Sequence, residues 1–476
     1  MTMLSYLRAE LDKAHRNYKT RNPSSAKAYG DSSTYLPGGN TRSVLHSSPF
    51  PLTIISAKGP NLESLDGHSY LDYLSDYSAA LFGHSNERIS DGVQRVLSDG
   101  WGYGAHNLYE KELARLLCQR FQPSGMEMVR FTNSGTEANI MAIATAVAAT
   151  GRKKILVFSN AYHGGPLSFP MAWCQDPKAY PSINLPYEFV PAPFNNIGET
   201  QDILANLPVG EDNFAAILVE PLQGAAGCRP AMKDFMQFLR GLADDTGALL
   251  IVDEVMTSRL ALGGLTSEYG IRADLMTVGK WVGGGMTLGA FGGRRDLMEL
   301  YNPITGRLTH SGTYNNNVFS MAAGIIGMDI YTREVLDIMN TEGNFLRSSL
   351  HHLLCGKIPP PDGAGLDNDF SSIMEIDSIE SGSALFIFPG CLDGYEPTPP
   401  IFVTGRGTVF AVRFGLEHSQ LWQELYLHHM LENGIYLAPR GFVALSTELT
   451  EVQHSAFFKA TEAFVLKHRR NLWNFF

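Results

Sequence analysis

Short apolar runs alternate with longer helical patterns between about residues 70 and 340. The apolar runs occupy residues 128–131, 154–158, 215–219, 248–252 and 275–278, and helical patterns occupy 136–150 and 232–246. Strands that are apolar along their whole length are covered on both faces, which is typical of parallel sheets. The pattern therefore predicts an α/β fold, with a large domain at residues 70–339 that contains a mainly parallel sheet covered by helices.

The two ends of the chain have a different pattern. Residues 1–18 form an amphipathic helical pattern, and Asp66-Gly67 lies between two strand-like runs, which predicts a two-residue hairpin turn. After residue 340, a strand is predicted in 407–415 and helices in 421–432 and 451–469. We expect segments 1–69 and 340–476 to form a smaller α+β domain together. A long insertion rich in Pro, Gly and Asp is expected at about 356–405.

Composition restricts the kinds of molecule that the protein is expected to bind. The chain has 476 residues, and its 37 Lys and Arg against 48 Asp and Glu give a net charge of −11. That balance argues against a nucleic-acid partner, which requires a basic face; the short basic cluster at 467–470 is expected to be a solvated helix face. The five cysteines are scattered without metal-ligand spacing, so we expect a reduced, cytoplasmic protein without a metal site. No apolar run approaches the roughly 18 residues of a membrane span, so the expected substrates are small molecules and no membrane is involved.

The first candidate for chemistry is the turn after the apolar run 128–131. Ser134, Gly135 and Thr136 stand at the start of a predicted helix. Unpaired N–H groups and the positive end of the helix dipole favour an anion there, two hydroxyls add donors, and Gly135 permits close approach of the main chain. Ordinary N-capping ahead of Glu137 is the alternative, and the sequence leaves both interpretations open.

Asp253 and Lys280 each follow an apolar run directly. Ligands of open α/β sheets bind outside the carboxyl ends of the strands, and a carboxylate there needs a cationic or strongly donating partner. Lys280 lies between Val278 and Trp281, where partial desolvation would lower the pKa of its amine and make it a usable nucleophile. A solvated strand end is the alternative for both residues. The glycine run 283–285 lacks the spacing of a dinucleotide-binding loop.

Tyr162 follows the apolar run 154–158 and could stack on a flat heterocycle, although a buried core tyrosine is the alternative. An anion site, a carboxylate, an amine and an aromatic ring are thus predicted at strand ends of one sheet. Pyridoxal phosphate requires such a set: a lysine for its imine, a carboxylate that keeps its ring nitrogen protonated, and a site for its phosphate.

The chain resembles the class III aminotransferases among the fold-type I pyridoxal-phosphate enzymes, nearly from end to end. The motifs that carry the resemblance occur in family order: NSGTEA (133–138), YHG (162–164), EPLQG (220–224), DEV (253–255), GKWVGGG (279–285) and SGTY (311–314). The 27 residues that separate Asp253 from Lys280 (280 − 253 = 27) also fit the family. Each motif is weak alone, but their combination in this order is highly specific.

The resemblance implies a role for each matching position. Lys280 joins the cofactor as an imine and later carries the proton, and Asp253 pairs with the pyridinium nitrogen. Val255 packs on one face of the ring and Tyr162 on the other. The remaining cofactor-binding positions are Ser134, Gly135 and Thr136 for the phosphate, Glu220 near the ring, and Thr313, which reaches the phosphate of the neighbouring subunit in a homodimer.

Within the class, the chain is most similar to the branch that holds glutamate-1-semialdehyde aminomutase and the β-amino-acid (β-phenylalanine type) aminotransferases. Val443 stands where the aminomutase normally has a gating Glu. Arg42 occupies the position of an arginine that binds the substrate carboxylate in the β-amino-acid branch, and Arg440 offers a second guanidinium; a surface ion pair is the alternative for each. A planar guanidinium suits a carboxylate.

The sequence therefore predicts a transaminase that moves an amino group from a small amino acid, expected to be a β-amino acid, to a keto acid. The alternatives are an aminomutase, a racemase or decarboxylase built on the same site, and a catalytically silent dimeric scaffold. The identity of the amino acid and its stereochemistry depend on loops that the sequence does not place.

Overall fold

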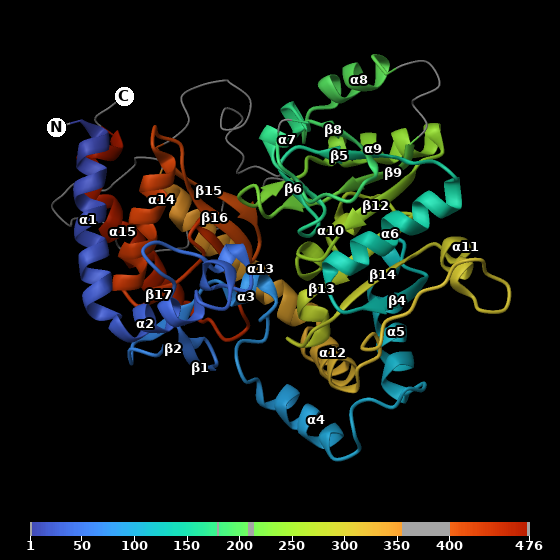
Figure 1. The fold of residues 1–476 in the computed structure, drawn as a ribbon, viewed down its shortest axis with the longest axis horizontal. Coiled ribbons are helices and arrows are strands. Elements are labelled where there is room, and N and C mark those ends of the chain that lie inside the picture. The colour runs from blue at the N-terminus through green and yellow to red at the C-terminus, as the bar shows by residue number, and fades with distance from the viewer. Residues whose placement is uncertain (1, 179, 208–213, 355–399, 474–476) are drawn as a thin grey trace. The chain divides into compact units, whose positions relative to one another are not determined.

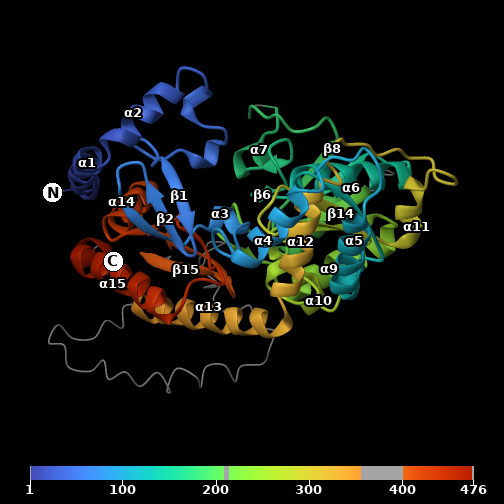
Figure 2. The same cartoon turned by 90° about the horizontal axis from the view of Figure 1, so that it is seen from below.

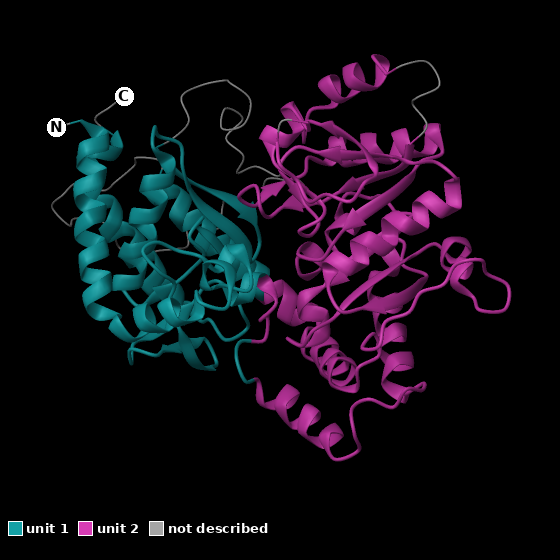
Figure 3. Cartoon of the chain, viewed as in Figure 1, with its two compact units in different colours: residues 1–77, 83–85, 339–476 teal, residues 78–82, 86–338 magenta. Residues whose placement is uncertain are grey.

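The computed structural model describes residues 2–178, 180–207, 214–354 and 400–473. These residues form two compact units (Figure 3). Unit 1 comprises residues 1–77, 83–85 and 339–476, and unit 2 comprises residues 78–82 and 86–338. The predicted domain limits, residues 70 and 340, lie near these divisions. That the two parts fold independently remains a proposal. Most of the predicted insertion at 356–405 lies outside the described residues.

Unit 2 is built on a seven-stranded sheet of order β4-β14-β13-β12-β9-β5-β8 (Figure 1). Its strands are β4 (Met128–Thr132), β5 (Lys154–Phe158), β8 (Glu188–Ala192), β9 (Phe214–Val219), β12 (Leu249–Asp253), β13 (Leu275–Gly279) and β14 (Gly289–Gly293). All neighbouring strands are parallel except at β14, which runs antiparallel to both β13 and β4. The predicted mainly parallel sheet is confirmed, and each predicted strand begins and ends within one residue of its expected bounds.

Helices cover this sheet. Every residue of β9, β12 and β13 is buried, and because successive side chains point to opposite faces, both faces of the central strands are covered. Helix α6 packs on β4, β14, β13, β12 and β9, whereas α9 packs on β9 and β12; α12 lies beside α4 and α5 (Figure 1 and Figure 2). The helices of unit 2 are α4 (Glu87–Leu97), α5 (Leu108–Phe121), α6 (Gly135–Thr150), α7 (Met171–Gln175), α8 (Ile197–Ala205), α9 (Lys233–Thr246), α10 (Leu265–Glu268), α11 (Arg295–Met298) and α12 (Val318–Ile330).

Strand β14 was not predicted, because its sequence GAFGG resembles a flexible turn. Its glycines are explained by close neighbours. A Cβ on Gly289 would come within 2.2 Å of the carbonyl oxygen of Ser134, and one on Gly293 within 2.1 Å of that of Asp274. Strand propensity favours large branched residues, so a strand selected for close backbone approach gives no such signal.

Unit 1 contains two smaller sheets. Strands β1 (Ile54–Lys58), β2 (Asn61–Ser64), β3 (Ser69–Asp72) and β17 (Ile435–Tyr436) form one, and β15 (Ile401–Arg406), β16 (Val409–Phe414) and β18 (Phe442–Ala444) form the other. Helix α1 packs on α14. The helices are α1 (Met3–Arg21), α2 (Pro23–Ser32), α14 (Ser419–Glu432) and α15 (Glu451–Trp473). Two further helices, the short α3 (Ser75–Ser78) and α13 (Arg333–Leu354), have residues in both units.

Two local predictions in unit 1 were wrong. The β2–β3 connection is longer than the predicted two-residue turn, because the pairing ends at Glu63 and Ser69. The Asp66 carboxylate accepts hydrogen bonds from the N–H groups of Ser24 and Ser25 (2.7 and 3.0 Å), so it serves the start of α2. The predicted insertion also extends too far, because residues 401–405 belong to β15, which pairs antiparallel with β16.

Among the described residues, no helix combines the length and apolar character needed to cross a bilayer.

Candidate active site

The predicted site residues of unit 2 follow the carboxyl ends of parallel strands. Strand β12 is parallel to β9 and β13, and β5 is parallel to β9. Because β14 is antiparallel to both of its neighbours, β4 and β13 also point the same way. The carboxyl ends of β4, β5, β9, β12 and β13 therefore meet at one edge of the sheet, which is where open α/β sheets bind ligands.

The turn after β4 forms a helix cap and leaves two backbone N–H groups that suit an anion. Ser134 Oγ accepts a hydrogen bond from the N–H of Glu137 (3.1 Å), so the capping alternative holds for this residue. In the described part of the chain, no hydrogen bond uses the N–H of Gly135 or of Thr136. These two donors, at the positive end of the 16-residue helix α6, suit a phosphate. The cap and the anion site are compatible, because the cap uses neither donor.

Two glycines allow this turn to come close to two other segments. A Cβ on Gly135 would come within 2.7 Å of both Val255 methyl groups, and one on Gly164 within 2.4 Å of Thr136 Oγ1. The segment after β12 and the YHG segment after β5 therefore both lie against the start of α6. Tyr162, two residues before Gly164, is 47% exposed, so its ring is available to a ligand.

A carboxylate is held rigidly at the end of β12. Asp253 is 6% exposed, and its Oδ2 accepts hydrogen bonds from His163 Nδ1 (2.8 Å) and Asn139 Nδ2 (2.7 Å). Its Oδ1 accepts from the N–H of Val255 (3.0 Å) and from Thr277 Oγ1 (3.3 Å). These donors meet the requirement that a buried carboxylate be satisfied, and they fix its direction. A carboxylate only accepts, so His163 carries a hydrogen on Nδ1.

Sequence reasoning missed the partners of Asp253. Asn139 lies one turn into α6 and also donates to the carbonyl of His163 (3.1 Å). The single hydroxyl hydrogen of Thr277 is shared between Asn139 Oδ1 (2.8 Å) and Asp253 Oδ1 (3.3 Å). The only sequence signal was the histidine beside Tyr162, since a buried Asn in a helix and a Thr in a strand are ordinary residues. Their importance comes from strand register, which places Thr277 opposite Asp253.

Glu220 is a second buried carboxyl group at this edge of the sheet. It directly follows β9, is 7% exposed, and accepts hydrogen bonds from the N–H of Tyr162 (2.9 Å) and of Gly224 (3.3 Å). The pKa of Glu220 is raised to about 7, with burial as the largest cause; His163 and the two backbone donors oppose the shift, and the Asp253 charge adds to it. Glu220 is therefore a group that changes charge near neutral pH.

Lys280 directly follows β13. Its backbone is left-handed, with φ +60°, and its neighbours Val278, Trp281 and Val282 are fully buried. The amine Nζ donates a hydrogen bond to Ser78 Oγ (3.2 Å). The structure thus places a partly buried amine at the same edge of the sheet as Asp253, beside buried apolar side chains.

Three predicted residues make none of these contacts. Thr313 is exposed in a loop of unit 2 that is hydrogen-bonded to the turn after β4. Arg42 and Arg440 belong to unit 1, where their guanidinium carbons lie 6.0 and 5.5 Å from the centre of the Tyr77 ring. Arg42 also forms an ion pair with Asp76 (3.0 Å), in which both side chains are about half exposed. The ion-pair alternative is therefore realised for Arg42.

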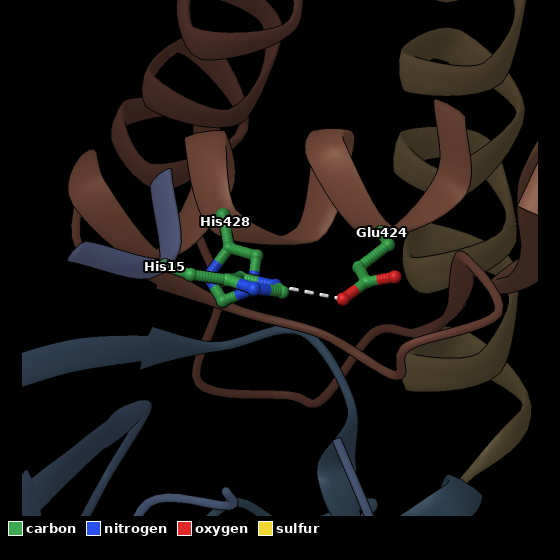
Figure 4. A group of neighbouring side chains, drawn as sticks. All are labelled: His15, Glu424 and His428. Carbon is green, nitrogen blue, oxygen red and sulfur yellow. Dashed lines mark hydrogen bonds and ion pairs between the residues drawn. The ribbon is translucent and has the colours of Figure 1, made fainter. Parts of the chain in front are cut away.

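One group outside these segments has metal-ligand chemistry (Figure 4). Ligand atoms of His15, Glu424 and His428 all lie within 4.8 Å of one another on α1 and α14. However, a carbonyl and a carboxylate only accept hydrogen bonds, so the 3.0 Å contact of His428 Nε2 with Ser48 O and the 2.8 Å contact of His15 Nε2 with Glu424 each use a protonated nitrogen. The hydrogen bonds of this group explain its geometry, and we assign it no ion.

The family model for class-III aminotransferases matches residues 44–356. A β-phenylalanine transaminase from Variovorax paradoxus is 40% identical, over 96% of this chain and 95% of its own length. The chain belongs to the class-III aminotransferase family. It is a pyridoxal-phosphate-dependent aminotransferase.

Other relatives extend this result. A glutamate-1-semialdehyde 2,1-aminomutase from Methanothrix thermoacetophila is 35% identical, over 72% of this chain and 80% of its own. A solved structure of a β-phenylalanine aminotransferase from Variovorax paradoxus has a TM-score of 0.83 and 38% identity, and it covers 97% of this chain and 98% of its own. The match extends over both units of the chain.

The residues present fit pyridoxal phosphate. The unused N–H groups of Gly135 and Thr136 suit its phosphate, the Asp253 carboxylate suits its ring nitrogen, and Lys280 suits its aldehyde. When bound, this cofactor supplies a carbonyl that amines can join and a ring that takes up carbanion charge. The ionised Asp253 would hold a proton on the ring nitrogen, and its four hydrogen bonds keep it in place.

Replacing Asp253 by Asn should preserve the fold and slow turnover per bound cofactor by about a hundredfold or more, because a preorganised charge is lost. The variant is compared with wild type by steady-state kinetics after the bound cofactor is quantified by absorbance. Asp274→Asn is the matched control, since Asp274 is equally buried but pairs with Arg240 and Arg294. A wild-type rate for Asp253→Asn would show that the carboxylate charge is not required.

The raised pKa of Glu220 predicts a pH-dependent stability. In the unfolded chain this carboxyl titrates near its ordinary pKa of 4.5, but in the folded protein it titrates near 7. The folded state therefore binds one proton more between these values, so stability falls as pH rises from about 4.5 to 7, by about 3 kcal/mol in total. Above about pH 7 the effect is constant.

The measurement is chemical unfolding of the cofactor-free protein at several pH values, compared with Glu220→Gln. The amide changes the free energy of unfolding by an amount that does not depend on pH, because its N–H₂ would face a backbone donor. The informative quantity is therefore how the difference in this free energy between wild type and variant changes with pH. Wild type should lose stability relative to the variant as pH rises. A difference that is flat across this range would show that Glu220 titrates normally.

Proposed function

We propose that this aminotransferase uses a β-amino acid as amino donor and a keto acid as acceptor. The observation that carries the proposal is the pair of guanidinium groups of Arg42 and Arg440 around the Tyr77 ring. The name of the Variovorax relative, which is similar over nearly the whole chain, supports the same substrate class. Arg42 and Arg440 are proposed to bind the substrate carboxylate.

The ion pair of Arg42 with Asp76 is compatible with this role. Both side chains are about half exposed, so the pair adds little stability and can open when a substrate carboxylate arrives. The Arg440 guanidinium lies over the rings of Tyr77 and Phe442, which stack at 5.8 Å. Two guanidinium groups on one aromatic platform suit the planar, bidentate recognition of a carboxylate.

For the cofactor, we propose that each matching residue has its family role. Lys280 joins the aldehyde carbon and later moves a proton between substrate and cofactor. Ser134, Gly135 and Thr136 hold the phosphate. Asp253 pairs with the ring nitrogen, Glu220 lies near the ring, and Val255 and Tyr162 pack on its two faces. The contacts of Val255 with Gly135 and of Gly164 with Thr136 support this set, because they bring the segments together.

An aminomutase reaction is the second candidate, since relatives with that name are similar over most of the chain. Val443 argues against it. This residue lies in β18 and is fully buried. It carries an apolar side chain where the aminomutase normally has a gating Glu. An apolar buried side chain cannot act as an acid or base, so retention of an amino intermediate by this position is not supported.

We also propose a homodimer in which Thr313 contacts the phosphate bound by the other subunit. Residues 311–314 are all exposed, and Tyr314 is 69% exposed. Hydrogen bonds from Asn316 to the carbonyl of Ala105 and from Asn107 to the carbonyl of Asn316 connect this loop to a second one, which exposes Trp101 (55%). Large exposed apolar side chains on neighbouring loops are typical of a protein interface.

A cytoplasmic location is proposed on the state of the cysteines. In the described part of the chain, Cys118 and Cys174 form no disulfide, as is usual in a reducing compartment.

The substrate proposal predicts a selective effect of Arg42→Ala. For 3-amino-3-phenylpropanoate as donor, kcat/KM should fall about 10- to 100-fold, because a charge-assisted hydrogen bond to the carboxylate is lost. For 1-phenylethylamine, which has no carboxylate, kcat/KM should stay within about twofold of wild type. Both are measured with 2-oxoglutarate and with pyruvate as acceptor.

Asp76→Asn is the matched control, because it breaks the same ion pair and leaves the guanidinium in place. If Arg42 binds substrate, this variant keeps or improves kcat/KM for the β-amino acid. If kcat/KM falls equally in Arg42→Ala and Asp76→Asn, or falls equally with both donors, Arg42 has only a structural role in its ion pair. Formation of an isomer or of carbon dioxide without use of any keto acid would contradict the transaminase itself.

The dimer proposal predicts complementation between two inactive variants. Lys280→Ala removes the amine from one site, and Thr313→Asp places a negative charge against the phosphate of the other subunit. A refolded equimolar mixture should regain about a quarter of the wild-type activity, because half of the dimers are mixed and each mixed dimer has one intact site. Thr305→Asp, in the same exposed stretch, is the control. No recovery above the separate variants would contradict a shared site.

A further inference from the structure

The short element α3 is a turn of left-handed backbone. Its four residues, Ser75, Asp76, Tyr77 and Ser78, have φ values of +47°, +42°, +54° and +76°, and none of them is glycine. In this conformation the Cβ of an L-residue approaches the following carbonyl oxygen, so single residues adopt it and whole turns rarely do. Strain of this kind persists only where the surroundings hold it, and it concentrates at functional sites.

The surroundings hold the turn at several points. Asp72 Oδ1 accepts a hydrogen bond from the N–H of Ser75 (3.0 Å), and Ser75 Oγ donates to the carbonyl of Ala444 (2.8 Å). The Tyr77 hydroxyl donates to the carbonyl of Val44 (2.7 Å). One bond anchors the turn to a side-chain carboxylate and two anchor it to backbone carbonyls, so they explain how the turn persists but not what it is for.

Ser78 differs from the other residues of the turn. It is 1% exposed, and its hydroxyl oxygen lies 3.2 Å from Lys280 Nζ. An ammonium group has donors and no acceptor, so Ser78 Oγ is the acceptor when the amine is charged. Both residues in this bond have left-handed backbone, since Lys280 has φ +60°. The direction of the Ser78 Cβ follows from the turn, so the strained backbone is what aims the hydroxyl at the amine.

We propose that Ser78 is a positioning residue for Lys280, and that it holds the amine whenever the amine is not joined to the cofactor. The inference rests on the proposed role of Lys280 as proton carrier. When its amine is free, Lys280 would take a proton from the substrate and become an ammonium, and one of its three N–H donors would bond to Ser78 Oγ. Lys280 would become neutral again on giving up a proton, and the bound cofactor would supply the group that takes the proton up.

The first test uses the cofactor-free protein and reads the amine directly. Ser78→Ala removes an acceptor from the ammonium form, so a larger share of Lys280 is uncharged and reactive at pH 7. Acetylation of Lys280, followed by peptide mass mapping with the exposed Lys233 as internal reference, should be about tenfold faster than in wild type. A rate equal to wild type overturns the inference.

The second test uses the cofactor-loaded enzyme. If Ser78 aligns the amine for proton transfer, kcat of Ser78→Ala should fall about 10- to 100-fold while KM for the donor changes little, because the hydroxyl acts after the donor has bound. With a donor deuterated at the reacting carbon, the isotope effect on kcat should be at least as large as in wild type. An unchanged kcat, or a smaller isotope effect, contradicts the inference.

Two further variants separate the hydroxyl from the backbone. Ser75→Ala removes a hydroxyl from the same strained turn and should lower the melting temperature, while Lys280 labelling and the isotope effect stay as in wild type. Ser78→Gly removes the hydroxyl and relieves the left-handed strain, so it should melt higher than Ser78→Ala and show the same loss of kcat. Wild-type kcat in Ser78→Gly would assign the effect to the backbone and overturn the inference.

The outcomes also distinguish this inference from the function on which it rests. A wild-type enzyme that binds pyridoxal phosphate but transfers no amino group from any donor contradicts the proposed function. A wild-type enzyme that transfers amino groups, together with a Ser78→Ala variant that matches it in labelling and in kcat, contradicts the inference alone.

Discussion

The buried carboxylate at the end of β12 is the constraint on which the site depends. The Asp253 side chain is 6% exposed and lies between strands of mostly apolar side chains, so its charge costs free energy unless donors surround it. Asp253 receives donors from three segments: His163 after β5, Asn139 on α6, and Thr277 on β13. Satisfying one charge therefore fixes the relative positions of the segments that carry the phosphate-binding turn and the lysine.

The backbone around this carboxylate is shaped by close approach and by strain. Gly135, Gly164 and Gly289 stand where a Cβ would collide with Val255, Thr136 or the carbonyl of Ser134. Lys280 and Ser78 instead have side chains on left-handed backbone. Glycine would adopt that conformation without strain, so the side chains at these two positions are kept despite their cost. This contrast supports a chemical role for both.

Glu220 is a second buried carboxyl group at this edge of the sheet, and its surroundings differ from those of Asp253. Asp253 accepts hydrogen bonds from three side chains and one backbone N–H, whereas Glu220 accepts hydrogen bonds from two backbone N–H groups. Burial is the main cause that raises the pKa of Glu220 to about 7. The fold therefore places a group that titrates near neutral pH beside the carboxylate of β12.

The sequence alone determined the fold class, the ends of five strands of the large sheet and the family, because continuous apolar strands, helix starts and motif order are local properties of the chain. It also singled out Asp253, Lys280 and the turn at Ser134–Thr136, since each starts within three residues of the end of an apolar run. Only the tertiary structure decided which side chains satisfy Asp253, that the glycine-rich segment 289–293 is a central strand, and that Ser78 bonds to Lys280 across 202 positions of sequence. These features depend on strand register, on atoms that come within contact distance, and on backbone angles, none of which leaves a periodic or compositional signal in the order of residues.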